Sequence, residues 1–71
     1  MAEIKFEIVE HIADISEKKN WKLELNRVKW NDGPAKLDLR SWSEDHSKCS
    51  KGISLTDEET DVLKEVLLTI I

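Results

Sequence analysis

Residues 36–42, Lys-Leu-Asp-Leu-Arg-Ser-Trp, decide how the chain folds, because their side chains alternate with the period of a β-strand. An extended strand places Lys36, Arg40 and Trp42 on one face and the two leucines between them on the other. Cations beside an aromatic ring are typical of surfaces that bind single-stranded nucleic acid, where phosphates meet the cations and bases stack on the ring. The stretch therefore predicts a strand with a polar, ligand-binding face.

Two further strands are predicted before this one. Residues 3–16 alternate at first, but the phase slips between Ile8 and Val9, so a strand here needs a bulge or a sharp bend. A helix through the isoleucines of the same segment is the competing interpretation. Residues 21 to about 30 alternate regularly and predict a second strand after a polar turn at residues 17–20.

The third strand, from about residue 35 to residue 43, is predicted to pair back through a turn at residues 31–34, Asn-Asp-Gly-Pro. The turn is predicted because Gly33 tolerates a positive φ and the proline cannot donate to a central ladder. A polar loop at residues 43–50 and a short fourth strand at residues 51–55 follow.

The chain is expected to end in a helix. Thr56 and Glu59 have the spacing of a capping box, and the acidic residues between them complement the helix dipole. One apolar stripe is predicted along the helix, made of Val62, Leu63, Val66, Leu67 and Ile70. Four strands followed by one helix predict a single α+β domain over residues 1–71.

The length of 71 residues makes a stable monomer hard to achieve, because so small a domain buries only about 60% of its unfolded surface. Cys49 is the one cysteine, so no internal disulfide can form. Oligomerisation is the remaining means of stabilisation, and the apolar end of the helix at residues 67–71 is expected to pack against a second subunit. The unpaired thiol and the lack of an apolar signal segment predict a cytoplasmic protein without a membrane anchor.

The net charge of −4 is unevenly distributed. Residues 18–51 carry nine cations and five acids, a net charge of +4, whereas the remainder carries −8. A basic middle is compatible with a local anion-binding surface, but a mixed-charge surface produces similar counts, so the charge does not decide the function.

Several blocks of the sequence resemble the single-stranded-DNA-binding transcriptional coactivators called positive cofactor four, and in particular their short bacterial YdbC-like branch. The resemblance covers residues 21–68 and extends to the opening at residues 5–8. It rests on residues 36–40 with Trp42, on Lys-Gly-Ile-Ser-Leu at 51–55, on Leu63-Lys64, and on the strand Trp21–Trp30 before the Asp32-Gly33 turn.

The resemblance implies a curved four-stranded antiparallel sheet followed by one C-terminal helix, with a homodimer packed through the helices. It further implies paired channels that bind single-stranded DNA with little sequence preference and without catalysis, in transactions such as transcription, replication or repair. The protein would then be associated with the nucleoid when bound to DNA. The coactivator role of the eukaryotic members does not transfer, because their regulatory N-terminal region has no counterpart here.

On the matching positions, the resemblance assigns Arg40 and Lys51 to ligand binding, and it aligns Trp42 with an aromatic residue to within one position. Asp38 shares the face of Arg40 and repels phosphate, so we expect it to orient Arg40 or to pair across the sheet. Gly52 is interpreted as a requirement of the backbone at the bend into the fourth strand.

The second strand leaves two arrangements open. The leucines of its first half and the Val28–Trp30 half have opposite parity, which favours a bulge near Asn26 that would turn Arg27 and Lys29 toward the ligand. Without the bulge, Trp30 faces the ligand and the two cations lie on the other side. The candidate nucleic-acid-binding residues are therefore Trp21, Lys22, Arg27, Lys29, Trp30, Lys36, Arg40, Trp42 and Lys51.

Other functions find less support in the sequence. The tryptophans are equally suited to a small core. His11, His46 and Cys49 form no catalytic or metal-ligating pattern, so we predict no enzyme activity, cofactor, metal site, small-molecule substrate or membrane partner. The alternative function is a dimeric protein-interaction module that uses the same basic and aromatic face. A purely structural dimer with buried tryptophans is a third interpretation, and the sequence does not distinguish DNA from RNA as the ligand.

Overall fold

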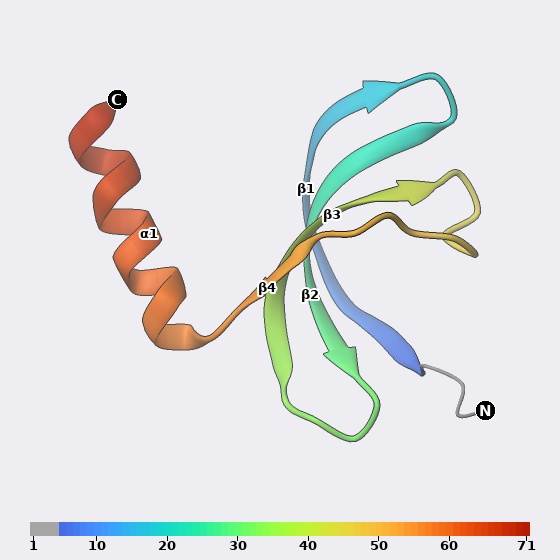
Figure 1. Cartoon of the computed structure of the whole chain (residues 1–71), viewed down its shortest axis with the longest axis horizontal. Helices are drawn as coiled ribbons and strands as arrows, with labels where there is room; N and C mark the ends of the chain where they lie inside the picture. Colours follow the sequence, from blue (N-terminus) through green and yellow to red (C-terminus); the bar gives the residue numbers. More distant parts are fainter. Residues whose placement is uncertain (1–4) are drawn as a thin grey trace.

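The computed structural model describes residues 5–71, which form four strands and one helix (Figure 1). The elements are β1 (Phe6–Lys18), β2 (Trp21–Trp30), β3 (Ala35–Ser43), β4 (Ile53–Leu55) and α1 (Asp57–Ile70). The strands pair in the order β1-β2-β3-β4, each antiparallel to its neighbour. The predicted α+β class, with a four-stranded antiparallel sheet followed by one C-terminal helix, is confirmed.

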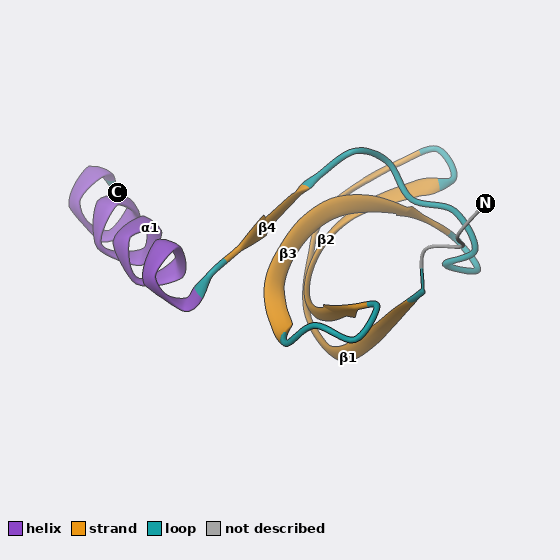
Figure 2. Cartoon of the chain, turned by 60° about the horizontal axis from the view of Figure 1, so that its bottom comes forward, coloured by secondary structure: helices purple, strands orange, loops and turns teal. Residues whose placement is uncertain are grey.

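Three bulges shape the first strand. The pairing of β1 with β2 passes over one extra residue of β1 at Val9, at Ile12 and at Ile15. Each bulge bends the strand and increases its twist, and Figure 2 shows the sheet curled around one of its faces. The slip predicted between Ile8 and Val9 is therefore confirmed as a bulge, and the helical alternative is wrong. The first two residues of the predicted strand lie outside the described residues.

The pairing of β2 with β3 has no irregularity, from Lys29 opposite Ala35 to Trp21 opposite Ser43. The favoured bulge near Asn26 is therefore wrong. The change of apolar parity along β2 has another cause: both faces of this strand are covered. Leu25 faces the groove shared with α1, while Val28 and Trp30 face the inside of the curl.

The sheet has an outer face, turned toward α1, and an inner face inside the curl (Figure 2). The outer face contributes apolar side chains to a groove shared with α1, among them Leu25, Leu37 and Leu39. The inner face holds the most deeply buried side chains of the described chain, which are Val28, Trp42, Glu24, Asn26 and Asp38. Three of these five are polar, so the inside of the curl is a hydrogen-bonded network as well as a core.

The turns differ in detail from those expected. Asn31, with φ of 52°, takes the left-handed conformation in the turn between β2 and β3, whereas neither glycine has a positive φ. Asparagine tolerates this region because its side chain can bond locally, and here Asn31 Oδ1 accepts from the backbone N–H of Lys5 at 3.0 Å. The fourth strand is also shorter than the predicted residues 51–55.

The predicted capping box at the start of α1 is confirmed. The backbone N–H of Glu59 donates to Thr56 Oγ1 at 3.1 Å, and the backbone N–H of Thr56 donates to Glu59 Oε1 at 2.9 Å. These hydrogen bonds with Thr56, reinforced by the charge of Lys36, hold the pKa of Glu59 below its ordinary value. The helix therefore starts at a fixed point directly after β4.

Most of α1 stands away from the sheet (Figure 1), and none of its residues is buried. Its apolar residues form two neighbouring rows rather than the single predicted stripe. Leu63 and Leu67 line the groove against the sheet, whereas Val62, Val66 and Ile70 line the next side of the helix. In the described part of the chain, no helix is long and apolar enough to span a membrane.

Candidate nucleic-acid interface

The inner face brings β2, β3 and β4 together around a central arginine. Arg40 lies between Asp38 and Trp42 along β3, and its pairing partner on β2 is Glu24. The regular register also places Lys36 on this face, as the alternation of β3 predicts. On β2 the residues that share this face are Lys22, Glu24, Asn26, Val28 and Trp30.

Arg40 is held in place by two groups. Its Nε and Nη2 atoms donate to the two oxygens of Asp38 at 2.7 and 2.8 Å, a bidentate pair with a fully buried carboxylate. The guanidinium carbon lies 4.6 Å from the ring centroid of Trp30, within the range of a cation–π contact. Burial alone would lower the pKa of Arg40, but the hydrogen bonds and charge of Asp38 outweigh it and raise the pKa above its ordinary value. Arg40 is thus a fixed, permanently charged group.

A ring of hydrogen bonds connects the same residues across three strands. The indole Nε1–H of Trp30 donates to Ser54 Oγ at 3.1 Å, and the Ser54 hydroxyl donates to Asp38 Oδ2 at 2.7 Å. Asp38 then accepts from Arg40, whose guanidinium covers the Trp30 ring. The expectation that Asp38 orients Arg40 is confirmed by this geometry. We refer to Trp30, Asp38, Arg40 and Ser54 as the arginine cluster.

Trp42 occupies a different environment. Its side chain is 0% exposed, and its ring packs against Phe6 and His46 with centroids 5.1 and 5.6 Å apart. Its indole nitrogen is buried and finds no acceptor within the described residues. Trp42 shares the face of Arg40 as predicted, but its ring is covered, so in this conformation it contributes to the core and offers no surface for stacking.

Two of the candidate cations on β2 lie on the outer face. Arg27 and Lys29 have the parity of Leu25 and not that of Trp30. Arg27 Nε lies 3.4 Å from Glu10 Oε1, a partly exposed ion pair that relieves the cost expected for a cation on this side. Trp30, the alternative candidate, is the residue that the register turns inward.

The remaining candidates are spread around the cluster. Trp21 is on the outer face at the far end of β2, where it lines a hollow with Leu23. Lys22 is on the inner face, 3.7 Å from Asp14 Oδ2. Lys36 lies close enough to the helix start to act on Glu59, and Lys51 is exposed just before β4. The structure therefore groups Trp30, Lys36 and Arg40 but does not bring Trp21, Arg27 or Lys29 to the same face.

Gly52 fits tightly beneath Arg40. A methyl group in place of its hydrogen would collide with Cβ of Arg40 and with the carbonyl oxygen of Leu39. Because one of these is backbone, the segment before β4 would have to shift. The close approach confirms that Gly52 meets a requirement of the backbone.

We expect Gly52→Ala to lower the free energy of unfolding by about 1–3 kcal/mol, the usual cost of overpacking, as measured by urea denaturation. Gly33→Ala is the matched control, because its added methyl would meet only the Trp30 carbonyl oxygen, at 3.3 Å. An equal decrease in the free energy of unfolding in the two variants would show that the contact at Gly52 is not tight.

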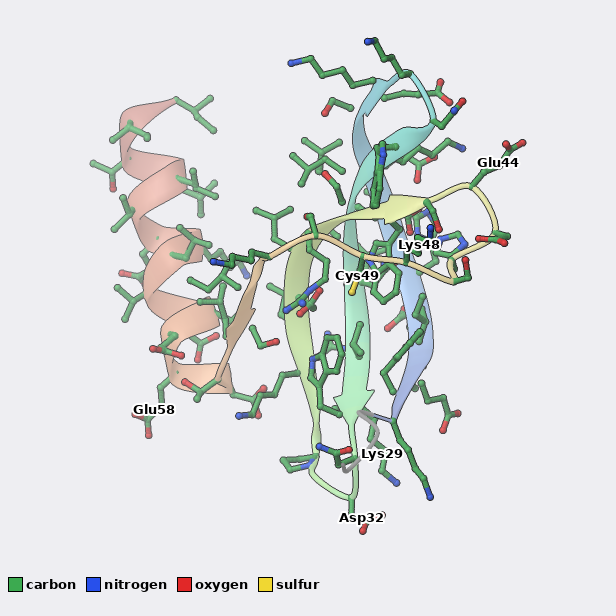
Figure 3. The ribbon with its side chains drawn as sticks, turned by 45° about the vertical axis from the view of Figure 1, so that its right-hand side comes forward. Lys29, Asp32, Glu44, Lys48, Cys49 and Glu58 are labelled. Atoms are coloured by element: carbon green, nitrogen blue, oxygen red, sulfur yellow. The ribbon has the colours of Figure 1, made fainter. Side chains whose placement is uncertain are left out.

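The loop from residue 44 to residue 50 returns alongside the end of β3. The backbone N–H of Ser43 donates to the Lys48 carbonyl, and that of Ser50 donates to the Ser41 carbonyl, both at 2.9 Å. Figure 3 shows Lys48 and Cys49 on this returning segment, with Glu44 at its outer end. Lys48 is an exposed cation near the site that the candidate set lacks. Its position depends on loop hydrogen bonds, for which the sequence has no periodic signal.

Asp45 fixes the tip of this loop and gives a pH-dependent prediction. Hydrogen bonds from the side chain and backbone of Ser47 and from the side chain of Ser43 lower the pKa of Asp45 to about 2. The ionised carboxylate therefore stabilises the folded loop above the ordinary pKa near 3.8, and this contribution is lost as the pH falls through about 2. We expect an NMR titration of Asp45 to have its midpoint near 2, and Ser47→Ala to move it up toward 3.8. A midpoint near 3.8 in both proteins would contradict the loop geometry.

Comparison with known proteins agrees with the geometry. The family model described as Transcriptional Coactivator p15 (PC4) matches residues 17–66, which include β2, β3, β4 and most of α1. The chain belongs to this family. The resemblance stated from the sequence is therefore confirmed at the level of the family, which is a nucleic-acid-binding and non-enzymatic one. Membership of the YdbC-like branch stays a prediction.

A bacterial relative is also similar over most of its length. An uncharacterised protein of Treponema pallidum (strain Nichols) is 40% identical over 63 residues, which cover 87% of this chain and 74% of the relative.

Proposed function

We propose that the chain is a sequence-nonspecific single-stranded DNA-binding protein that acts as a cytoplasmic homodimer, with phosphates held by lysine and arginine and bases stacked on exposed aromatic rings. Its family supports nucleic-acid binding.

The arginine cluster is the observation that carries this proposal. Asp38 accepts one hydrogen from Nε and one from Nη2 of Arg40. Three N–H hydrogens of the guanidinium remain, beside the Cys49 side chain, and can donate to a phosphate oxygen. Asp38 already fixes the planar guanidinium of Arg40, so little side-chain entropy is lost when a phosphate binds. Trp30 and Phe6, whose centroids are 5.7 Å apart, are the partly exposed rings beside it and can stack bases.

Three exposed or partly exposed lysines extend the positive charge beyond the cluster. Lys36 is on β3, Lys48 is in the loop that returns alongside the end of β3, and Lys51 lies just before β4. Flexible lysines act as point charges along a phosphate backbone without selecting a base. Binding that combines such contacts with stacking is sequence-tolerant, because every base has an aromatic face.

The homodimer is supported by the apolar groove between α1 and the outer face. Its volume is about 610 Å³, and ten of its twelve lining residues are leucine or isoleucine, with Leu68 71% exposed. A soluble chain rarely leaves a continuous apolar surface open. The helix of a second copy has the complementary two-row apolar surface, so a twofold arrangement would cover both grooves at once.

Fluorescence anisotropy with labelled oligo-dT, a matched duplex and oligo-U tests the proposal. We expect the single strand to bind more tightly than the duplex, because duplex DNA hides the faces of its bases. The affinity should fall with salt, with a log–log slope of about −0.7 for each neutralised phosphate. Comparable oligo-U affinity would extend the ligand to RNA. Absence of binding to both single strands at low salt would contradict the proposal and favour the protein-interaction module.

A further inference from the structure

A second polar cluster lies on the inner face between β1 and β2, next to the arginine cluster, because its Glu24 is the pairing partner of Arg40. His11 and Asp14 come from β1, and Glu24 comes from β2. One ligand atom from each of these three residues lies within 4.8 Å of the other two. The sequence predicts no metal site, because these residues are as many as 13 positions apart and follow no ligand-spacing pattern.

The charge of Glu24 lacks a permanent counter-ion. Its side chain is only 3% exposed, and its ion-pair partners among the described residues are His11 and His46, at 3.5 and 2.9 Å. A buried carboxylate without a compensating cation is costly, so the burial of Glu24 favours a cation bound at this position.

The hydrogen bonds around His11 suit a metal ligand. Its Nδ1–H donates to the side-chain oxygen of Asn26 at 2.6 Å, which leaves Nε2 directed toward Asp14 Oδ1 at 3.2 Å. Histidines that bind metals usually donate their second nitrogen to a neighbouring acceptor, which fixes the ring and its tautomer. A separation of 3.2 Å also suits two ligands bound at about 2.0–2.2 Å from one ion.

Asn26 orients two of the three ligands at once. This fully buried amide accepts from His11 and donates from Nδ2 to Glu24 Oε1 at 3.1 Å. Lys22 contacts Asp14 through Oδ2, at 3.7 Å, and so leaves Oδ1 free to face the histidine. His11 and Asp14 are about half exposed, which gives an ion access from solvent and an open position for water.

We propose that His11, Asp14 and Glu24 form a binding site for one divalent transition-metal ion of the Zn²⁺ class, with Asn26 as a positioning residue. One imidazole and two carboxylates form a ligand set that suits Zn²⁺ and neighbouring transition ions better than Mg²⁺ or Ca²⁺, which prefer oxygen ligands alone. The inference is independent of single-strand binding.

Calorimetric titration of the tag-free protein with Zn²⁺, and absorption spectroscopy with Co²⁺, test the site. We expect one ion per chain, a Co²⁺ spectrum without sulfur-to-metal charge transfer, and at least a tenfold loss of affinity in His11→Gln and in Asp14→Asn. Asp14 is half exposed on β1, so its variant keeps the fold even if a Glu24→Gln variant does not.

Two control variants exclude other sites. Asp45→Asn removes an exposed acid next to His46, and Cys49→Ser removes the exposed thiol. Both should bind Zn²⁺ as the unmodified protein does. Absence of binding in the unmodified protein, unchanged affinity in folded Asp14→Asn, or loss of binding in Cys49→Ser would overturn the proposal.

Discussion

Arg40→Gln is expected to bind single-stranded oligo-dT about ten- to a hundredfold more weakly than the unmodified protein. The substitution removes one phosphate contact and the charged surface over Trp30. Hydrogen bonds to charged groups are worth about 1.5–3 kcal/mol each, and 1.4 kcal/mol corresponds to a factor of ten in affinity. Anisotropy titration at fixed salt measures the effect.

Two further variants separate binding from folding. Arg40→Gln leaves the buried Asp38 carboxylate without its partner, so Asp38→Asn combined with Arg40→Gln restores a neutral pair and keeps the weak binding. Arg27→Gln removes a cation from the outer face, and its affinity should change by less than about twofold. If Arg27→Gln lost as much affinity for oligo-dT as Arg40→Gln, the inner face would not be the binding surface.

Leu67→Asp is expected to abolish the dimer. Leu67 is 43% exposed in one chain and lines the groove where the second copy is proposed to pack. A charge buried there costs several kcal/mol, which raises the dimer dissociation constant at least about a hundredfold. Sedimentation should then give a particle of 8.2 kDa in place of one twice as large, with a lower melting temperature because the monomer core is small.

Glu58→Ala is the matched control for the helix. Glu58 is in the first turn, and its side chain projects away from the rest of the molecule (Figure 3). It lines neither apolar row of the helix, so the variant should sediment as a dimer. A monomer for the unmodified protein at micromolar concentration, or a dimer for Leu67→Asp, would contradict packing through the helices.

The regular alternation of β3 and the start of α1 were predictable from the sequence. The alternation in β3 predicts both its bounds and its face, and the capping box locates the start of α1. Only the first of the three β1 bulges was recognised, because Ile12 and Ile15 also fit a helical spacing.

The error in β2 came from assuming that one face is apolar and the other polar. Val28 is fully buried inside the curl while Leu25 lines the groove on the outer face, so both parities are apolar without a bulge. The curl also covers Trp42, which its place on the strand does not reveal. The cluster of His11, Asp14 and Glu24 depends on the β1–β2 register, which three bulges set and a single sequence does not specify.

Indole N–H signals in ¹H–¹⁵N NMR spectra test the central claim, that the inner face around Arg40 binds single strands, most directly. Trp30 belongs to the arginine cluster, and its Nε1–H donates to Ser54. Trp21 has the parity of the outer face and serves as an internal control. Titration with oligo-dT should shift the Trp30 signal strongly and leave the Trp21 signal almost unchanged. A shifted Trp21 signal together with an unchanged Trp30 signal would contradict binding at the inner face.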